Sequence, residues 1–557
     1  MAIIREKHWK VAVGDHINAE RPDEIIGHLL SRRGLDTDAE RQRFLNPRLQ
    51  DLADPLRLQD MDRAVERAQQ ALLKREKILI YSDYDVDGMS SSALLYRFWA
   101  GLNGEARVFI PERKSEGYGL SIQGLQRALS DGPVSLLFAL DCGTTSCEEV
   151  AWLNSRGIDV IIIDHHELGS ELPAAHAFIN PQRGETDRIL STAGLVFKFC
   201  HAFLKIRRDP SLFNLKEHLD FVALGTVADL VPLRDDNRIL VRHGLEQLNG
   251  TNHIGLQALM DVAGVQRDPT PSTVGFVLGP RLNASGRLAE ARSGWELLTT
   301  EDPGRATDLA RDLDQLNRER QKLEQTAFED ADALLALQPE SENKYCIVVA
   351  SPDWHQGVVG IVASRLQRSY YKPVIVISLS EKGGKGSARC IEGCSIMDAL
   401  RDNAHFLKGF GGHAMAAGLE IEPDKIPDFR KALNAWFCKS VDCGVYLEQL
   451  RIDLELPGRA LTENLAEETS RLEPFGKQNE SPVYMVRGIR VLGAPKIFAQ
   501  RHIRFTGQAA GVRFAAVGFG MAGNFASSAA LDLAGHWEVD GFTQRPSFRI
   551  LDWRRAA

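Results

Sequence analysis

The sequence lacks any long run of apolar residues. No window approaches the about 18 consecutive apolar residues that a membrane-spanning helix needs. Residues 1–10 carry charged side chains and contain no apolar core of a secretion signal. We therefore expect a cytoplasmic protein with no membrane segment.

Cysteine is scarce, and its spacing excludes a common kind of site. The chain has 8 cysteines, and none of them forms a Cys-x-x-Cys pair. This spacing argues against a thiolate zinc site and, without a secretion signal, against a disulfide framework. We interpret Cys142, which stands beside the candidate ligand Asp141, as a plain buried thiol.

The chain also has no excess of positive charge, since its formal net charge is −8. Any affinity for a polyanion must therefore come from a local basic surface. At 557 residues the chain is too long for one hydrophobic core, and we expect roughly three or four domains.

Apolar runs of strand length alternate with helical segments in the first third of the chain. A helical pattern over 61–74 comes first, and the runs that follow are Lys77–Ile80, Val108–Ile110, Ser135–Leu140 and Ile158–Ile163. Continuous apolar runs separated by helices are typical of parallel strands buried on both faces. The pattern predicts an α/β domain built on a parallel sheet.

An acidic stretch follows the first of these runs. Asp83, Asp85 and Asp87 alternate there, and in an extended backbone alternate side chains point the same way, so they could converge on one hard cation. A solvated turn is the open alternative, because Asp and Gly favour turns. The calcium loop of an EF-hand is excluded, because Leu94 occupies the twelfth position, where a bidentate Glu belongs.

Further acidic residues follow the later runs. Asp141 follows the third run, Asp164-His165-His166 follows the fourth, and Asp229 ends an apolar helical segment. Each Asp alone could be a helix N-cap, but ligands gather at the carboxyl ends of parallel strands. Carboxylates with imidazole and no thiol predict a binuclear site for Mg²⁺ or Mn²⁺ rather than zinc.

These motifs resemble those of the DHH phosphoesterase family, and within it the bacterial exonucleases that degrade single-stranded DNA in the 5′→3′ direction. The motifs are DYDVDG at 83–88, ALDCGT at 139–144, IDHH at 163–166, GTVADLVPL at 225–233, GPRLNASGR at 279–287, HQGVVGIVASRL at 355–366, GSAR at 386–389 and GFGGHAMAAG at 409–418. The resemblance runs from about residue 60 to the end of the sequence. It implies two-metal hydrolysis of phosphodiester bonds in DNA recombination and repair.

The resemblance also implies a role for each acidic motif. Asp141 would bridge the two ions, Asp83 and Asp85 would serve mainly one ion, and Asp87, His165 and Asp229 would serve mainly the other. Asp164 would orient His165, and His166 would contact the scissile phosphate or act as general acid. Tyr81 stands where related phosphatases carry a histidine.

Residues outside the metal centre would hold the DNA strand. The later motifs resemble a DHHA1 domain, in which Ser387, Arg389 and a glycine turn would bind phosphate, and capping of a terminal phosphate would give the 5′ preference. Two arginines in the loop 279–287 suit phosphate oxygens, although surface arginines on a turn are the alternative. The expected nucleic-acid contacts are Arg113, Tyr118, Arg281, Asn283, Arg287, Ser387, Arg389, Gly411, Gly412 and His413.

The last part of the chain changes character. Short alternating runs predict a small β-barrel of the OB type, and they are Val483–Val491, His502–Thr506, Val512–Phe519, Trp537–Phe542 and Phe548–Trp553. The aromatic residues Phe498, Phe505 and Phe514 lie among arginines, as in a base-stacking platform, or else fill the barrel core.

The full prediction has five parts. They are a helical lead-in over 1–60, a DHH catalytic domain over 61–300, a connecting helix over 301–338 of about 50 Å, a DHHA1 nucleic-acid-binding domain over 339–447 and an OB-like domain over 448–557. The resemblance implies single-stranded DNA as substrate, a single-strand-binding protein and a RecQ-type helicase as partners, and a monomer. A small-molecule DHH phosphatase and a non-catalytic replication scaffold are the alternatives; Asp or His at every expected ligand position argues against the scaffold.

Overall fold

The computed structural model describes residues 7–11, 20–112, 119–184, 189–266, 268–288, 291–523, 525, 530–541 and 543–556. The chain forms two compact units. Unit 1 comprises Met1–Gly34, Glu319–Arg471 and Pro482–Ala557, and unit 2 comprises Leu35–Arg318 and Leu472–Ser481. Among the described residues, no helix has both the length and the apolar character needed to cross a membrane.

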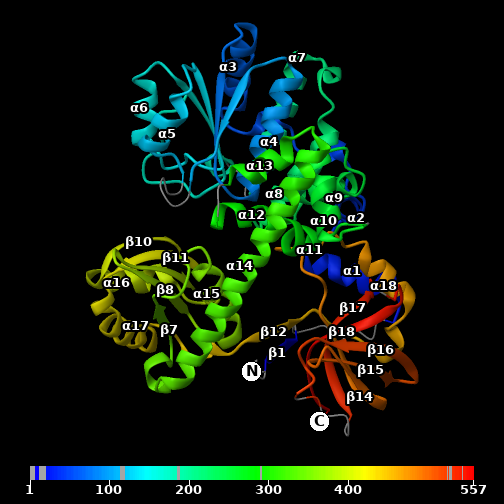
Figure 1. Ribbon diagram of the computed structural model, residues 1–557. Helices are drawn as coiled ribbons and strands as arrows, with labels where there is room; N and C mark the ends of the chain where they lie inside the picture. Colours follow the sequence, from blue (N-terminus) through cyan, green and yellow to red (C-terminus); the bar gives the residue numbers. More distant parts are fainter. Residues whose placement is uncertain are drawn as a thin grey trace. The chain divides into compact units, whose positions relative to one another are not determined.

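Unit 2 is built on a parallel sheet of five strands in the order β3-β2-β4-β5-β6. Figure 1 shows this sheet in the upper part of the picture, with helices on both sides. The strands are β2 (Ile78–Ser82), β3 (Ala106–Phe109), β4 (Leu136–Leu140), β5 (Asp159–Ile163) and β6 (Ala177–Ile179). The predicted parallel sheet is confirmed. Strand β6 was not predicted, because its three residues are too few to show a pattern.

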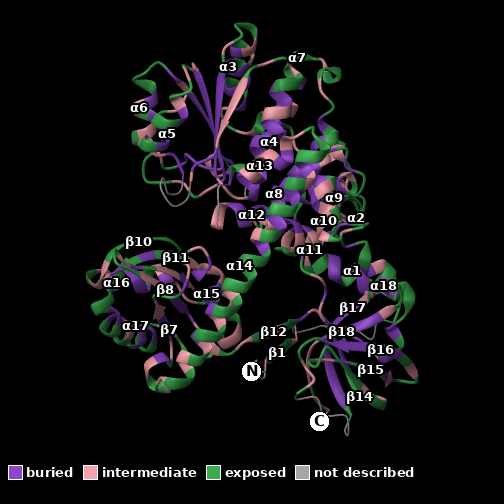
Figure 2. Ribbon diagram, in the orientation of Figure 1, coloured by how far each residue is buried: buried purple, intermediate pink, exposed green. Residues whose placement is uncertain are grey.

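Helices cover both faces of this sheet. The helices of unit 2 are α2 (Asp38–Leu45), α3 (Met61–Leu73), α4 (Val86–Gly101), α5 (Ile122–Leu129), α6 (Cys147–Asn154), α7 (Thr192–Arg207), α8 (Leu219–Ala228), α9 (Asp235–Asn249), α10 (Ile254–Ala263), α11 (Pro271–Thr273), α12 (Gly279–Leu288) and α13 (Arg292–Thr299). One core lies under α5 and α6, and a larger core lies under α3, α4, α7 and α8. The central strands are therefore buried along their whole length (Figure 2).

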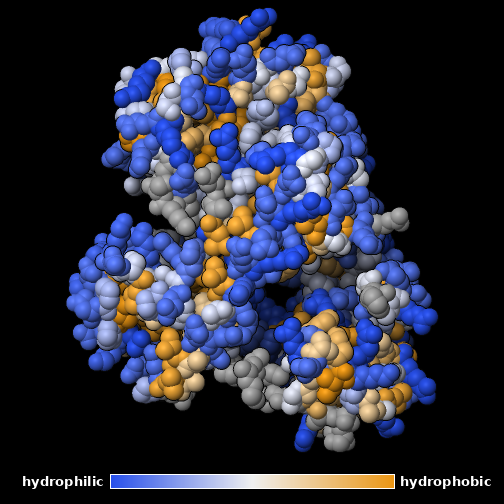
Figure 3. Space-filling model, in the orientation of Figure 1, coloured by the Kyte–Doolittle hydropathy of each residue, from blue (hydrophilic) through white to orange (hydrophobic). Residues whose placement is uncertain are grey.

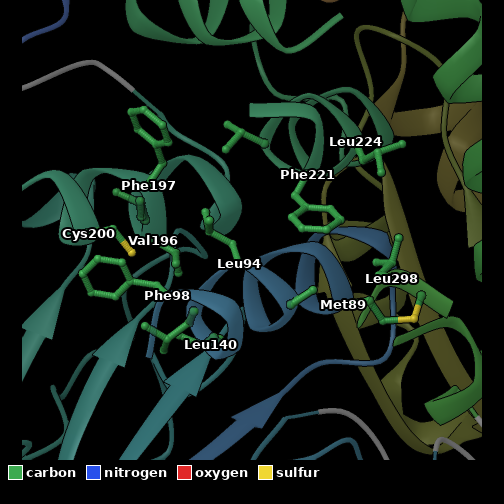
Figure 4. Close-up of a cluster of buried hydrophobic side chains, with 14 of the residues drawn as sticks. Met89, Leu94, Phe98, Leu140, Val196, Phe197, Cys200, Phe221, Leu224 and Leu298 are labelled. Atoms are coloured by element: carbon green, nitrogen blue, oxygen red, sulfur yellow. The ribbon is translucent and has the colours of Figure 1, made fainter. Parts of the chain in front are cut away.

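The larger core fixes the helices that carry the acidic residues. Leu94 and Phe98 of α4 lie among Val196 and Cys200 of α7 and Leu140 of β4 (Figure 4). Each of these side chains is fully buried. Burying a side chain of this size stabilises the fold by about 1.5–3 kcal/mol, so α4 and α7 are held firmly against the sheet.

The predicted connecting helix is confirmed as α14 (Pro303–Leu337), and the boundary between the units falls within it. The chain then forms a mixed five-stranded sheet in the order β10-β11-β9-β8-β7. Its strands are β7 (Ile347–Ser351), β8 (Val374–Ser380), β9 (Gly383–Arg389), β10 (Leu407–His413) and β11 (Ala416–Ile421), and its helices are α15 (Val359–Tyr370), α16 (Ile396–Asp402) and α17 (Ile426–Ser440). This part has the predicted α/β character.

The C-terminal part is a closed barrel. Strands β14 (Tyr484–Phe498), β15 (His502–Ala509), β16 (Val512–Gly518), β18 (Pro546–Arg555) and β17 (Leu531–Val539) pair in that order, and β17 pairs again with β14. The predicted barrel is confirmed. The strand predicted over 537–542 lies earlier, at β17; its pattern was hidden because Asp532 interrupts the apolar run, where it accepts the amide of Gly488 at 2.9 Å.

Shorter elements complete unit 1. They are β1 (His8–Val11), α1 (Pro22–Arg32), β12 (Gln449–Ile452), β13 (Leu454–Glu455) and α18 (Glu463–Ser470), and β1 pairs in parallel with β12. Hydrophobic residues also appear at the surface of the barrel among hydrophilic ones (Figure 3). Residues 472–481 follow α18 but belong to unit 2, whereas the predicted boundary at 448 assigned them to the barrel.

Candidate metal centre

The acidic loop between β2 and α4 places its three aspartates differently from the prediction. Asp83 directly follows β2, and Asp85 is the N-cap of α4, where its Oδ1 accepts the amides of Asp87 at 2.9 Å and Gly88 at 3.1 Å. Asp87 lies in the first turn of α4. The alternation expected of an extended backbone is therefore wrong, because the helix already begins at Val86.

The ligand atoms of the predicted metal residues nevertheless lie close together. They form two groups, each within 4.8 Å: Asp83, Asp85 and Asp141 in one, and Asp87, His165 and Asp229 in the other. A third group, Asp141, His165 and His166, shares one residue with each of them. The Nε2 of His165 joins the groups, since it lies 3.4 Å from Asp141 Oδ1 and 3.4 Å from Asp229 Oδ2. All six residues lie at the carboxyl ends of β2 and β4, just after β5, or at the ends of α4 and α8.

The start of α7 orients two of these carboxylates. Both oxygens of Asp87 accept backbone amides, from Thr192 at 2.7 Å and Ala193 at 3.0 Å. The hydroxyl of Thr192 donates to Asp141 Oδ1 at 2.9 Å. Helix α8 also approaches Asp87 closely, because a Cβ on Gly225 would lie 2.3 Å from its Oδ1. Sequence reasoning missed Thr192, although Ser191 beside it reads as a helix N-cap.

Asp141 has an uncommon backbone conformation. Its φ of 60° lies in the left-handed region, which residues other than glycine rarely adopt. Strained residues of this kind cluster at functional sites. Aspartate and asparagine tolerate this region better than alanine does, so the backbone at this position favours them.

The carboxylates of the cluster repel one another, and burial and this repulsion raise the pKa values of Asp85 and Asp229. Burial and the charges of Asp141 and Asp229 raise the pKa of Asp85 to about 7, and burial raises the pKa of Asp229 to about 6. Burial lowers the pKa of His165, but the hydrogen bond to Asp141 and the surrounding carboxylates outweigh it and raise that pKa to about 10.

Bound cations would neutralise the charge of these buried carboxylates. Its donor atoms are carboxylate oxygens and imidazole nitrogen, which suit Mg²⁺ or Mn²⁺. Cys142 is buried, as predicted, and burial and the neighbouring charges raise the pKa of its thiol well above the usual range. The thiol is therefore protonated, which makes it a poor metal ligand.

Asp164 contacts a different histidine from the one we expected. Its Oδ1 lies 2.7 Å from the ring Nδ1 of His166, whereas it meets His165 only at the backbone amide, at 2.8 Å. The expected orientation of the His165 ring by Asp164 is therefore wrong. Both histidines follow Asp164 in the sequence, and it is the ring of His166 that contacts its carboxylate.

The contact between Asp164 and His166 favours the charged form of both side chains. Burial raises the pKa of Asp164, but the bond to His166 and the hydroxyl of Thr144 lower it overall to about 2. Burial lowers the pKa of His166, but Asp164 raises it overall to about 9. Thr144 Oγ1 donates to Asp164 Oδ2 at 2.6 Å, and Asn180 Nδ2 donates to the His166 carbonyl at 3.0 Å. Sequence reasoning gave no role to Thr144 or Asn180.

The segment 279–287, which we expected to be a loop, forms helix α12. Its buried face, which includes Leu282, Ala284 and Ser285, explains the helix. Arg281 donates to Asp314 Oδ1 at 3.0 Å and to the Val277 carbonyl at 2.7 Å, so its guanidinium is already engaged. Asn283 and Arg287 are half-buried on the same helix. Arg113 and Tyr118 lie outside the described residues.

The expected phosphate-binding residues of unit 1 are neighbours across three strands. Ser387 on β9 lies opposite Gly418 on β11, which lies opposite Gly411 on β10, and two positions further along the strands Ala416 lies between Arg389 and His413. The expected turn at 411–413 is wrong: Gly411, Gly412 and His413 end strand β10, and the hairpin turns after them.

The start of α15 adds to this group. A Cβ on Gly360 would lie 3.1 Å from Ser387 Oγ, so the first turn of the helix is in contact with the strand residues. Arg389 donates to Ser387 Oγ at 3.0 Å and to Ser364 Oγ at 3.1 Å. A helix N-terminus beside an arginine and a hydroxyl is a favourable place for a phosphate group.

The aromatic residues of the barrel divide into two kinds. Phe505 and Phe514 are only 5% exposed and belong to the barrel interior, so a stacking role is wrong for both. Phe498 is 38% and Phe519 is 56% exposed. Both rings lie within 5.2 Å of the ring of His502, measured between centroids, and Phe519 was not singled out from the sequence.

Comparisons with known proteins agree with this architecture. The chain matches the DHH family N-terminal domain over residues 77–226, the DHHA1 domain over 342–439 and the RecJ OB domain over 452–551. Fold and domain matches together place the chain in the DHH class of proteins, with a DHHA1 domain and an appended OB barrel.

Individual relatives identify the family to which the chain belongs. The single-stranded-DNA-specific exonuclease RecJ of Haemophilus influenzae is 38% identical, with 77% of this chain and 76% of that protein covered. RecJ of Bacillus subtilis is 37% identical over 86% of this chain, which spans 61% of that protein's length. The chain belongs to the RecJ family.

Solved structures show the same fold. Crystal structures of RecJ from Thermus thermophilus in complex with Mn²⁺ and with Mg²⁺ match with TM-scores of 0.83 and 0.76, at 27% and 26% identity. The match with the Mn²⁺ complex covers 99% of this chain and 80% of that chain.

Proposed function

We propose that this chain is a metal-dependent exonuclease that hydrolyses single-stranded DNA from its 5′ end during recombination and repair. The observation that carries the proposal is the pair of ligand groups joined by Asp141 and His165 within a DHH fold. The named activity of the RecJ relatives, single-stranded-DNA-specific exonuclease, agrees with it.

The two ligand groups suggest how Mn²⁺ or Mg²⁺ would be held. Asp83 and Asp85 would hold one ion, Asp87, His165 and Asp229 the other, and Asp141 would serve both, because it lies within 4.8 Å of ligand atoms from Asp83, Asp85 and His165. When bound, two such ions activate water and neutralise the phosphoryl oxygens. The amides of Thr192 and Ala193 keep Asp87 in place for this role.

His166 is suited to the scissile phosphate. Asp164 holds its Nδ1 at 2.7 Å and raises its pKa, so that the imidazole is protonated near neutral pH. A protonated imidazole can bind a phosphoryl oxygen or donate a proton to the departing 3′ oxygen. The side chain is 36% exposed, whereas Asp164 is buried, so His166 is the accessible member of the pair.

The remaining predicted residues would hold the strand. Ser387, Arg389 and the first turn of α15 would bind the terminal 5′ phosphate, with Gly411, Gly412 and His413 beside them. On α12, Asn283 and Arg287 would contact the backbone, and Arg281 would position that helix through Asp314. Arg113 and Tyr118 remain candidates for contacts near the metals.

A small-molecule phosphatase is the competing function. It would need the metal centre but not the barrel, whose exposed Phe498 and Phe519 suit stacked bases. Cleavage of a long single strand and of a dinucleotide, each with and without Mn²⁺, separates the two. We expect rapid cleavage of the long strand that requires Mn²⁺ and fails in Asp141→Asn; preference for the dinucleotide would favour the phosphatase.

We also propose, from family resemblance, a cytoplasmic monomer that works with a single-strand-binding protein and a RecQ-type helicase. Light scattering of the purified chain tests the monomer. Co-sedimentation with each partner, compared between the full chain and Phe519→Ala, tests whether the barrel surface contributes to binding. No complex with either partner at micromolar concentration would contradict this part of the proposal.

A further inference from the structure

The segment 472–481 is held in unit 2 by its own backbone. Arg238 of α9, only 2% exposed, donates to the carbonyl of Leu472 at 2.9 Å and to that of Glu473 at 2.7 Å. Asn479, 1% exposed, braces the segment from within by donating to the carbonyls of Leu472 and Pro474 at 2.9 Å each. A buried arginine is held in such a place only when its donors are satisfied, so this attachment is specific.

The segment also reaches the loop that follows Asp229. The amide of Leu233 donates to the carbonyl of Lys477 at 2.8 Å, and Arg234 Nε donates to the carbonyl of Gln478 at 3.1 Å. Gly476 lies against Leu233, where a Cβ would come within 2.6 Å of Leu233 Cδ1. Lys477 is therefore fixed by its main chain to a residue that lies four positions after a predicted metal ligand.

The side chain of Lys477 has no part in this attachment. It is exposed, and the segment is held through backbone carbonyls and Asn479. The main-chain bond to Leu233 places Lys477 beside the loop 230–233, which directly follows the predicted ligand Asp229.

We infer that Lys477 binds a phosphate group of the single strand beside the metal centre. A charged lysine has three donors and no acceptor, so it cannot itself bind a cation, but it suits the anion that the cations attract. The inference rests on the proposed nuclease function and adds a strand contact that comes from outside the DHH motifs.

The alternative role for Lys477 is purely electrostatic tuning of Asp229. Loss of the charge would then change Mn²⁺ affinity, whereas loss of a phosphate contact would change DNA affinity and its dependence on salt. Each lost contact to a single strand flattens the slope of log affinity against log salt by about 0.7.

The test uses Lys477→Met and Lys477→Arg, with Lys74→Met as matched control. Lys74 is also exposed; it follows α3 and precedes the amino end of β2, whereas the metal residues follow the carboxyl ends of the strands. Affinity for a long oligonucleotide is measured across a salt series in an Asp141→Asn background, and Mn²⁺ affinity is measured with Asp141 intact. Circular dichroism checks that each variant is folded.

We expect Lys477→Met to lower DNA affinity several-fold and to flatten the salt slope by about 0.7, with Lys477→Arg restoring most of both. Lys74→Met should change neither. Equal slopes for Lys477→Met and Lys74→Met would overturn the inference, and so would a change in Mn²⁺ affinity with an unchanged slope. Absence of cleavage by the unaltered chain would instead contradict the proposed function, while the binding series would still test Lys477.

Discussion

The carboxylate of Asp164 lies 2.7 Å from the Nδ1 of His166 and meets His165 only at its backbone amide. The pair divides the two adjacent histidines between two tasks. His165 faces Asp141 and Asp229, and His166 is oriented from behind by a buried anion. Changes at Asp164 should therefore affect catalysis more than metal binding.

We expect Asp164→Asn to lower kcat by about 10–100-fold while Mn²⁺ affinity changes much less. The neutral amide no longer stabilises a protonated His166, so the alkaline fall in the kcat pH profile, where His166 loses its proton, should move to lower pH. Steady-state kinetics and Mn²⁺ titration measure both. A fall in Mn²⁺ affinity as large as the fall in kcat would show that Asp164 serves His165 after all.

Asp141→Asn should abolish hydrolysis and leave the fold intact. Asn is the better test than Ala, because it tolerates the φ of 60° at this position, whereas Ala would add strain. Removal of a carboxylate shared by both ligand groups should also cost more activity than Asp85→Asn. Turnover near that of the unaltered chain at saturating Mn²⁺ would contradict the shared role of Asp141.

Mn²⁺ binding should release protons and strengthen as pH rises. The folded chain holds protons on Asp85, whose pKa is about 7, on Asp229, whose pKa is about 6, and on His165, whose pKa is about 10. Metal binding must displace these protons. Calorimetry in buffers of different ionisation enthalpy counts the protons released.

The same groups make the stability of the metal-free protein, measured with a chelator present, depend on pH. Carboxyl pKa values raised above the usual range mean that the folded state binds more protons than the unfolded state, so stability falls as pH rises from about 4 to about 7. The raised pKa of His165 acts in the same direction, because its contribution is complete below about 6.5 and is lost toward about 10. The increase in Tm caused by Mn²⁺ should therefore grow between about pH 5 and about pH 8; a constant increase would contradict this account.

Arg389→Ala should weaken the preference for a 5′ end more than it weakens bond cleavage. The arginine contacts Ser387 and Ser364 next to the first turn of α15, where a terminal phosphate would lie. Digestion of strands blocked at either end, with and without a 5′ phosphate, measures the preference. Arg389→Lys is the control, since it keeps the charge but loses the planar fork. An unchanged ratio between the two blocked strands would exclude this phosphate site.

Phe498→Ala and Phe519→Ala should each weaken binding of long strands without changing the salt slope. Stacking of a base on an exposed ring contributes about 1–3 kcal/mol and does not depend on ions. Val539→Ala, at a residue that is 40% exposed on β17, is the matched control. If all three variants bind equally well, the barrel surface serves protein partners instead of bases.

Local patterns predicted the framework of the site well. Asp141 and Asp164 could be placed because parallel strands end at one edge, and that rule needs only the apolar runs. The rule failed where a helix begins within a few residues of a strand, or where a strand continues through an expected turn. Asp87 joins a different ligand group from Asp83 because α4 begins at Val86, and Gly411 lies in a strand because its partner Gly418 pairs with it.

Contacts between distant residues could not be predicted at all. Thr192 holds Asp87 across 105 positions of sequence, and Asp314 holds Arg281 across 33. Neither contact leaves a periodic signal, because each depends on how whole helices pack. The aromatic residues of the barrel show the same limit: Phe505 and Phe498 lie in similar sequence surroundings, but only the closure of the barrel decides which ring is buried.

The detached position of residues 472–481 has a consequence for biosynthesis. Unit 2 is interrupted after Arg318, and the ribosome must add about 150 residues before the segment that completes it appears. At about 5–20 residues per second this interval lasts roughly 8–30 s. During that time Arg238 has no access to the carbonyls of Leu472 and Glu473, and Leu233 has none to that of Lys477. A nascent chain that ends at residue 447 carries the whole DHHA1 sheet, yet its unit 2 still awaits its final backbone partners.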